Sequence, residues 1–321
     1  MTTPQHPIGS GFDAASTATD VLAGLDLTGT LAVVTGGYSG IGLETTRALS
    51  KAGASVVVPA RRPEVAQEAV RDLDRVEVDE LDLGDLSSVQ AFADRFRASG
   101  RSIDLVIGSA GIMACPETRV GPGWEAQFAT NHLGHFALTN RLWPALAADG
   151  GARVVSVSSA GHRNSGIRWD DVMFEHDYDK WQAYGQAKTA NALFAVHLDA
   201  QGREAGVRAF SLHPGGILTP LQRHLPISEM VAAGWIHEDG SPANDGFKSP
   251  EQGAATQVWA ATSPQLAGMG GVYCEDCDIA DLADAATGSR MGVKDWATDP
   301  AEASRLWTLS AELTGVDAFG A

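Results

Sequence analysis

The sequence predicts an α/β fold, a doubly wound parallel sheet with helices on both faces. Short runs of valine, isoleucine and leucine recur along the chain and are separated by helical stretches of about 10 to 15 residues. The runs show no polar alternation, which is typical of parallel strands covered on both faces. A glycine-rich turn follows the first run directly. In this architecture ligands bind beyond the carboxyl ends of the strands.

Six segments have the character of strands, and each is bounded by turn residues or by a helical stretch. They are residues 31–34, 55–58, 76–78, 103–107, 153–157 and 207–211. Helices are expected from the glycine turn to about Gly53, from the second strand to about Val70, and over 87–98 and 184–200.

Two late helices carry clear start signals. Ser249 can cap a helix that has Pro250 at its first position and Gln252 three residues after the cap. Asp299 and Pro300 repeat this pattern, and a glycine at 315 can end the last helix. Residues 1–28 are polar and turn-rich, with a short helix near 17–23, so we expect an N-terminal extension followed by a single domain over 29–321.

Composition excludes several classes of protein. The chain has 23 basic and 40 acidic residues, a formal net charge of −17. Such a surface repels phosphate backbones and anionic lipid, so no nucleic-acid or membrane partner is expected. No apolar run reaches the roughly 18 residues that cross a bilayer, and the first residues lack the pattern of a signal peptide. We therefore expect a cytoplasmic protein.

Only three cysteines are present, too few for a disulfide framework. Cys274 and Cys277 form a C-x-x-C pair, but the remaining Cys115 is distant and no closely spaced histidine pair accompanies them. A structural zinc site needs four ligands, so we expect no metal and a structural or incidental role for the pair.

The turn Thr35-Gly36-Gly37-Tyr38-Ser39-Gly40-Ile41-Gly42 lies between the first strand and the first helix. Glycines at these places allow a tight turn and the close approach of a pyrophosphate, and the helix N-terminus favours the negative charge. Turn glycines alone are common, but their place in the first βα unit favours a dinucleotide.

The end of the second strand indicates which dinucleotide. A site for NAD usually has an acidic residue about 20 residues after the turn, on the ribose 2′-hydroxyl. Here the sequence reads Pro59-Ala60-Arg61-Arg62, with no acid at the strand end. Guanidinium groups suit a 2′-phosphate, so NADP(H) is predicted over NAD(H). The alternative is that both arginines are solvated residues at a helix start.

Tyr184 and Lys188 lie four residues apart on a helical segment, so their side chains project from one face. An ammonium beside a phenol favours the phenolate, so we expect the pKa of Tyr184 to fall toward neutrality. A phenol tuned in this way can donate or accept a proton at cellular pH. The spacing alone also occurs on ordinary helix faces.

The glycine turn and the Tyr-x-x-x-Lys pair together resemble the short-chain dehydrogenase/reductase family, and the resemblance covers nearly the whole chain from about Leu27. It implies a Rossmann-type fold and a nicotinamide cofactor. Other family landmarks appear in the right order, namely an adenine-contacting Asp82-Leu83, the helix asparagine Asn131, a serine pair at 158–159 and the segment Pro214-Gly215-Gly216-Ile217-Leu218-Thr219. The resemblance is greatest to the retinol dehydrogenase and WW-domain oxidoreductase branch, which includes many bacterial members.

This resemblance also assigns the roles of the site residues. Tyr184 would exchange a proton with the substrate oxygen, Lys188 would lower its pKa and hold the nicotinamide ribose, and Asn131 would hold a water that relays protons to Lys188. A serine would donate a hydrogen bond to the substrate oxygen; alignment of the strand end favours Ser159 over Ser158. The implied cofactor contacts are Gly36, Tyr38, Ser39, Gly40, Ile41, Gly42, Arg61, Arg62, Asp82, Leu83, Ala110, Gly111, Asn131, Tyr184, Lys188, Pro214, Gly215, Ile217 and Thr219.

Two departures from the family matter. The usual Asn-Asn-Ala-Gly motif is Gly108-Ser109-Ala110-Gly111 here, which puts the local geometry of the cofactor cleft in doubt. The vertebrate retinol enzymes carry a membrane anchor that this chain lacks, which weakens a transfer of retinoid substrates. Relatives are commonly dimers or tetramers joined through the helix that bears the Tyr-Lys pair, so a homo-oligomer is an option.

The substrate is indicated only in outline. An insert between Ser159 and Tyr184 holds the aromatic residues Trp169, Phe174, Tyr178 and Trp181, and a substrate lid is expected around 220–248. Together they suggest a bulky or apolar alcohol, ketone or aldehyde, although the aromatics could simply pack the insert onto the domain. Two other functions stay open, reduction of an enone with NADP(H) and a non-catalytic regulator that binds NADP(H).

Overall fold

A twisted eight-stranded sheet runs through the molecule in the order β10-β9-β8-β7-β4-β1-β2-β3. The computed structural model describes residues 3–243, 245–284 and 291–320. Neighbouring strands are parallel except for the antiparallel pair β9 and β10. The strands are β1 (Leu31–Thr35), β2 (Ser55–Ala60), β3 (Val76–Glu80), β4 (Leu105–Gly108), β7 (Arg153–Val157), β8 (Arg208–His213), β9 (Val272–Glu275) and β10 (Asp278–Ile279).

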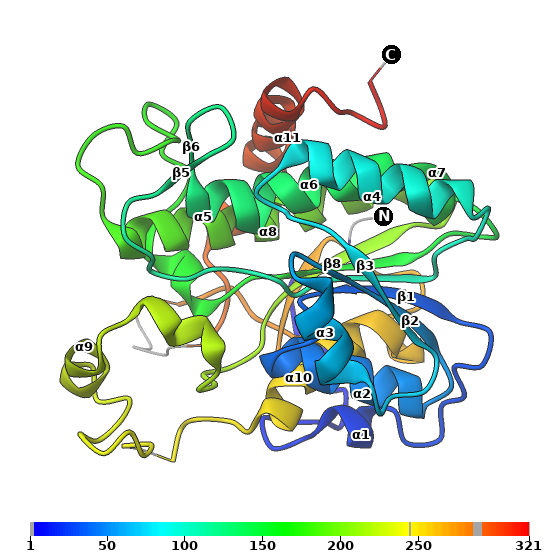
Figure 1. Ribbon diagram of the computed structural model, residues 1–321, viewed down its shortest axis with the longest axis horizontal. Coiled ribbons are helices and arrows are strands. Elements are labelled where there is room, and N and C mark those ends of the chain that lie inside the picture. Colours follow the sequence, from blue (N-terminus) through cyan, green and yellow to red (C-terminus); the bar gives the residue numbers. More distant parts are fainter. Residues whose placement is uncertain (1–2, 244, 285–290, 321) are drawn as a thin grey trace.

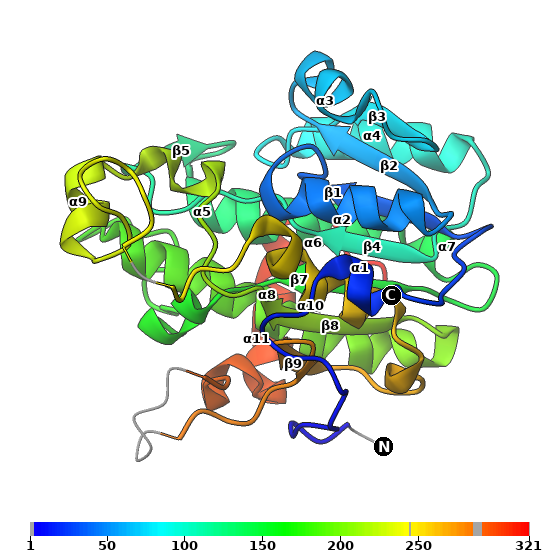
Figure 2. The same ribbon diagram turned by 90° about the horizontal axis from the view of Figure 1, so that it is seen from below.

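Helices cover both faces of this sheet, which confirms the predicted doubly wound architecture (Figures 1 and 2). One face carries α1 (Ala18–Val21), α2 (Gly40–Lys51) and α10 (Pro250–Thr262), and the other carries α4 (Leu86–Ala98), α6 (Gly134–Arg141), α8 (Lys180–Gly202) and α11 (Pro300–Thr314). The shorter elements are α3 (Pro63–Val70), the hairpin β5 (Arg119–Val120) and β6 (Trp124–Glu125), α5 (Ala126–Phe128), the π-turn η1 (Ala129–Leu133), α7 (Trp143–Leu146), α9 (Ile227–Ala232), and the 3₁₀ turns η2 (Ala160–Asn164), η3 (Arg203–Ala205), η4 (Pro220–His224), η5 (Pro264–Leu266) and η7 (Asp295–Ala297).

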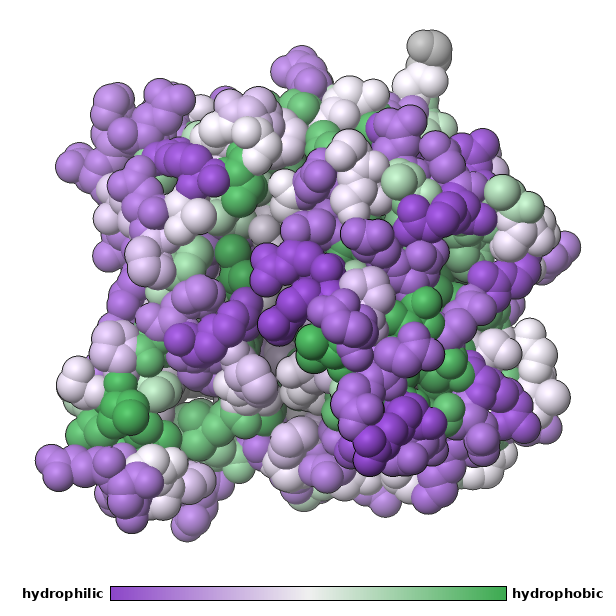
Figure 3. Space-filling model, viewed as in Figure 1, coloured by the Kyte–Doolittle hydropathy of each residue, from purple (hydrophilic) through white to green (hydrophobic). Residues whose placement is uncertain are grey.

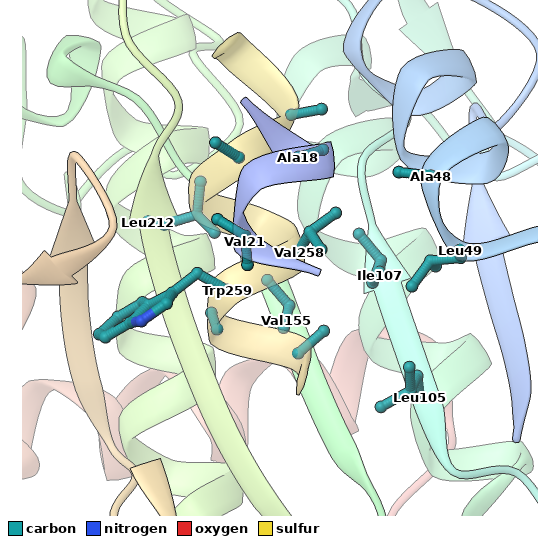
Figure 4. Packing of buried hydrophobic residues seen from close by; sticks show 14 of the residues in the cluster. Ala18, Val21, Ala48, Leu49, Leu105, Ile107, Val155, Leu212, Val258 and Trp259 are labelled. Carbon is teal, nitrogen blue, oxygen red and sulfur yellow. The ribbon is translucent and has the colours of Figure 1, made fainter. Parts of the chain in front are cut away.

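The two core clusters follow from the alternation of side chains along each strand. On β1, Val34 faces the cluster under α2 and α10, while Val33 faces the cluster under α4 and α6. Figure 4 shows side chains of α1, α2 and α10 directed at strand residues such as Val155 and Leu212. Trp259 of α10 is fully buried there. Its truncation to alanine is expected to cost about 3–5 kcal/mol of stability.

The six predicted strands are all present, and the predicted caps of the two late helices are confirmed. Ser249 and Gln252 form a reciprocal capping box at the start of α10. Asp299 caps α11, and Gly315 ends it in the left-handed region with φ 67°. The strands β9 and β10 were not predicted. The C-x-x-C pair is the turn between them, and both sulfurs are buried.

Helix α8 is enclosed within one chain, which bears on the predicted subunit interface. Every residue from 183 to 195 is buried. Leu193 and Phe194 pack against Leu306 and Trp307 of α11, and the ring planes of Phe194 and Trp307 are stacked with centroids 5.8 Å apart. A second copy could not use this stretch as an interface without displacing α11.

The N-terminal residues lie along the antiparallel edge of the sheet (Figure 2). The side chain of Gln5 bonds the backbone N–H and C=O of Tyr273 and the C=O of Ala280. Further along, the carboxylate of Asp278 accepts three successive backbone N–H groups, from Ile8, Gly9 and Ser10, at 2.8, 2.9 and 3.0 Å. The extension is therefore tied to the fold by its backbone over this stretch.

Candidate active site

The glycine turn lies at the carboxyl end of β1 and opens α2. A Cβ on Gly36 would lie 2.9 Å from the Cα of Ala110, and one on Gly42 would lie 2.3 Å from the carbonyl oxygen of Gly36. Only glycine fits at these two positions without a backbone shift. The hydroxyl of Ser39, the N-cap residue of α2, makes no capping hydrogen bond. The N-terminus of α2 therefore has no side-chain cap from its own N-cap residue, an arrangement suited to an anion.

The segment after β8 folds back onto this turn. The Cβ of Thr219 lies 3.3 Å from the position that a Cβ on Gly40 would occupy. Ile41 and Ile217 both lie against Gly253 of α10. Gly215 adopts φ 102° and has the alkyl chain of Lys248 against it. The structure thus brings together the turn, the end of β4 and the segment 214–219, as the resemblance implied.

The arginines after β2 are exposed. Neither the Arg61 nor the Arg62 guanidinium has a hydrogen bond or ion pair with another residue in the described part of the chain. Asp82 accepts the N–H of Gly84 at 2.8 Å, and the carbonyl oxygen of Leu83 lies against Gly134 of α6. The two arginines follow the end of β2, and Asp82 and Leu83 follow the end of β3. All four therefore lie at the edge of the sheet where the glycine turn follows β1.

Tyr184 is buried, with 4% of its surface exposed, and the side chain of Ser159 lies close enough to its phenol to lower the pKa of that group. Ser159 follows β7 and caps η2 by accepting the N–H of Gly161 at 3.0 Å. Its neighbour Ser158 points elsewhere and donates to the backbone oxygen of Lys188 at 2.7 Å. Of the two serines, Ser159 is therefore the one beside the phenol.

The predicted lowering of the tyrosine pKa is contradicted in the protein without a ligand. Burial raises the pKa of Tyr184 to about 12, and the nearby side chain of Ser159 only partly opposes this. The ammonium of Lys188 donates to the carbonyl oxygen of Val157 at 2.9 Å and not to the phenol. Burial also lowers the pKa of Lys188 to about 8. Loss of water around both groups outweighs their mutual influence.

Asn131 lies in the π-turn η1, an irregularity common at functional sites. Its side-chain amide bonds both the N–H and the C=O of Ile112, each at 2.9 Å. A Cβ on Gly111 would lie 3.1 Å from the Asn131 Oδ1 atom and 3.8 Å from the Lys188 Nζ atom. Asn131, Gly111 and Lys188 therefore meet at one place.

Two histidines near these residues were missed from the sequence. His135 bonds the backbone oxygen of Asn131 at 3.0 Å and the hydroxyl of Thr35 at 2.8 Å. His162 bonds the backbone oxygen of Ser159 at 2.6 Å through Nδ1, and its Nε2 accepts the N–H of Lys294 at 3.1 Å. The sequence signal was present in the His-x-x-His spacing at the junction of η1 and α6 and in the Ser-Ala-Gly-His run, but neither indicates a partner.

Of the four aromatic residues of the insert, only Trp181 lies beside Tyr184. The others pack the insert onto the domain, since Trp169 donates to Glu302, Tyr178 donates to the backbone oxygen of Cys115, and Phe174 is fully buried. The lid contributes Leu221, Leu225, Met230 and Trp235 to an apolar cluster that also holds Met113, Ala114, Trp181 and Tyr184.

No group of three or more residues that could ligate a metal occurs in the part of the chain that the structure describes. Burial raises the pKa of the Cys277 thiol to about 11 and raises that of Cys274 further, so neither is poised as a thiolate. Among the described helices, none has the length and apolar character needed to cross a bilayer.

Comparison with known proteins bears on this arrangement. The family model for short chain dehydrogenases matches residues 30–229. A Streptomyces lividans protein named as a probable oxidoreductase is 43% identical over 296 residues, which cover 90% of this chain and 98% of the relative. Mouse retinol dehydrogenase 12 is 35% identical and covers 91% of this chain and 88% of its own. A solved structure of an uncharacterised Mycobacterium paratuberculosis protein superposes with a TM-score of 0.72 at 32% identity, covering 94% of this chain and 98% of the other. The chain therefore belongs to the short-chain dehydrogenase/reductase family of oxidoreductases.

Proposed function

We propose that this protein interconverts an alcohol and a ketone or aldehyde with NADP(H), and that its substrate is bulky or apolar. The observation that carries the proposal is the buried phenol of Tyr184, which lies beside Ser159 and packs with apolar lid residues. Two hydroxyl groups in apolar surroundings suit the uncharged carbonyl oxygen of a substrate better than they suit a charged substrate group. A cytoplasmic location is part of the same proposal, and the three buried, unpaired cysteines fit it.

The residues present fit a dinucleotide. Gly36 and Gly42 leave no room for side chains where the pyrophosphate would approach, and the N-terminus of α2 has no side-chain cap from Ser39. The unpaired guanidiniums of Arg61 and Arg62 suit the 2′-phosphate of NADP(H) and would gain nothing from a ribose hydroxyl pair alone. When bound, the cofactor would supply or accept the hydride.

The chain's own groups would handle the proton. With a pKa of about 12, Tyr184 carries its proton at neutral pH and can donate it to a substrate oxygen. The Ser159 hydroxyl, which lies near the phenol, can donate to the same oxygen as negative charge develops. Lys188 stays largely protonated at neutral pH despite its lowered pKa and places a positive charge near both groups. Asn131, fixed on Ile112, would hold the water that links Lys188 to solvent.

Calorimetry with NADPH and NADH, followed by assays on panels of ketones, aldehydes and enones, tests the proposal. We expect tighter binding of NADPH and cofactor oxidation with large apolar ketones or aldehydes. Equal or tighter binding of NADH would overturn the cofactor assignment. Turnover of enones alone would favour a double-bond reductase, and binding of NADPH without any turnover would favour a regulator.

A further inference from the structure

We propose that Glu229 of α9 is a latch that fastens the lid onto the start of α8, and that it thereby fixes Trp181 as the residue that selects the substrate of Tyr184. This inference rests on the proposed function, because it concerns which molecules reach the same phenol. It goes further because it names the contact that holds the lid closed, made by Glu229, and the side chain that borders the substrate, Trp181.

The carboxylate of Glu229 contacts two successive residues in the first turn of α8. Its Oε2 atom lies 2.5 Å from Nζ of Lys180, and its Oε1 atom accepts the indole N–H of Trp181 at 3.1 Å. Both acceptor atoms are therefore used at once. The hydrogen bond from Lys180 is the main reason that the pKa of Glu229 is lowered, so the carboxylate is charged at neutral pH.

The bond to Glu229 fixes how the indole of Trp181 is oriented. On one side the ring meets Tyr184 edge-on, with centroids 6.5 Å apart and planes at 84°. On the other side it meets Trp235 of the lid, with centroids 6.0 Å apart and planes at 82°. Rotation of the indole would break the N–H bond and both edge-to-face contacts, which are a preferred geometry for aromatic pairs.

The latch also holds the rest of the lid in place. Met230, next to Glu229 on α9, joins the apolar cluster around Tyr184 together with Leu221 and Leu225. Hydrophobic side chains gather over α9 in Figure 3, where Ile227 is 58% exposed. A helix with apolar residues on both sides has little inherent preference for one orientation, so the polar contacts of Glu229 decide which side faces the phenol.

The chemistry of the apolar cluster around Tyr184 defines the class of substrate. The members of the cluster are aliphatic, aromatic or methionine side chains, and on the lid side the charges of Lys180 and Glu229 neutralise each other. A charged substrate would lose its hydration there without gaining a partner. The structure therefore points to an uncharged ketone or alcohol whose apolar ring or branched group lies against the fixed indole of Trp181.

A purely structural ion pair would behave differently. Lys180 and Glu229 are 29% and 33% exposed, and such pairs contribute little to global stability. A structural role thus predicts a small change in melting temperature and no change in selectivity. The latch predicts a local change in the lid and in the preference between large and small substrates.

The test compares Glu229→Ala, Lys180→Met and the double variant with a matched control. Glu238→Gln is that control, since Glu238 is an exposed lid residue without a side-chain partner in the described structure. The first readout is hydrogen exchange over 225–236 with no substrate present. Loss of the latch should speed exchange there by about three- to tenfold in Glu229→Ala, with no change in Glu238→Gln.

The second readout is the ratio of kcat/KM for a large apolar ketone to that for a small one. Glu229→Ala should lower this ratio by about tenfold, mainly through KM. The double variant should be no worse than Glu229→Ala, because both partners serve one contact. Unchanged exchange and an unchanged ratio would overturn the latch. If no variant and no wild-type enzyme turns over any carbonyl, the proposed function fails, while the exchange readout still decides on the latch.

Discussion

The ammonium nitrogen of Lys188 lies 5.6 Å from the ring centroid of Tyr184, yet its hydrogen bond goes to the backbone of Val157. Lys188 can therefore influence the phenol only through its field. In the protein alone this field does not offset the burial of the tyrosine, whose pKa is raised to about 12. The phenol of Tyr184 is thus protonated at neutral pH, as the proposed role in proton donation requires.

Removal of the phenol oxygen should abolish the chemistry and leave the cofactor site intact. We expect Tyr184→Phe to lower kcat by about 10³-fold or more, because the phenol is the group that would transfer the proton, while Ser159 would supply only a hydrogen bond. Calorimetry should show an unchanged affinity for NADPH. Tyr178→Phe serves as the control, since its hydroxyl donates to the backbone oxygen of Cys115, outside the insert. An active Tyr184→Phe would contradict the mechanism.

The two serines after β7 should separate cleanly by their kinetics. Ser159→Ala removes the partner of the Tyr184 phenol and should cost about 10²–10³ in kcat. Ser158→Ala removes only a bond to the backbone of Lys188 and should cost about 1 kcal/mol of stability, with activity near normal. Steady-state assays with urea unfolding on both variants check this, and the opposite pattern would exchange the two roles.

The choice of cofactor should depend on the arginines after β2. Loss of charge in Arg61→Ala and Arg62→Ala together should raise Kd for NADPH by about 10- to 100-fold, because hydrogen bonds to phosphate are charge-assisted. The affinity for NADH should stay the same. Arg71→Ala, whose guanidinium pairs with Glu68, is the matched control. An equal loss for both cofactors would show that the arginines do not read the 2′-phosphate.

Buried histidines should make the protein sensitive to mild acid. Burial lowers the pKa of His132 to about 3 and those of His135 and His162 to about 4. The unfolded chain takes up these protons near pH 6.5, so the stability is full above about 6.5 and falls as the pH drops toward 4. Each histidine contributes a slope of up to about 1.4 kcal/mol per pH unit.

Urea unfolding between pH 4.5 and 7.5 measures this slope. His132→Phe should lower the pH slope of the unfolding free energy by the contribution of one histidine. The missing bond to Ser310 lowers the stability itself and does not affect this slope. The exposed His237→Gln should leave the slope unchanged. A slope that is the same in His132→Phe and the wild type would show that His132 is not kept neutral by burial.

The fold was largely predictable because its signals are local. Each predicted strand is a short segment rich in apolar residues, and Ser249 and Asp299 cap their helices through backbone N–H groups only a few residues away. Helix α8 begins four residues before the predicted start. Asp179 caps it there by accepting the N–H groups of Trp181 and Gln182. That signal was legible in the sequence. The strands β9 and β10 are too short to give a pattern, and their cysteines suggested other chemistry.

The site was predictable only where a motif fixes both the residue and its neighbours. Tyr184, Ser159 and the glycine turn fall together as the motif implied, but the pKa of Tyr184 does not follow, because burial is a property of the assembled fold. The contacts of Glu229 are equally non-local, since they join the lid to a helix 48 and 49 residues away in the chain. No spacing rule connects these residues.

The hydrogen bonds of Asp278 have a consequence for how the sequence can change over evolution. Its carboxylate accepts three main-chain N–H groups, so these contacts do not depend on the side chain of Ile8, which can change as long as proline is avoided. A change at Asp278 would remove all three bonds at once. A protein that loses this one carboxylate would keep the bonds of Gln5 but lose the main-chain anchor of residues 8–10, so this stretch would become more accessible to proteolysis.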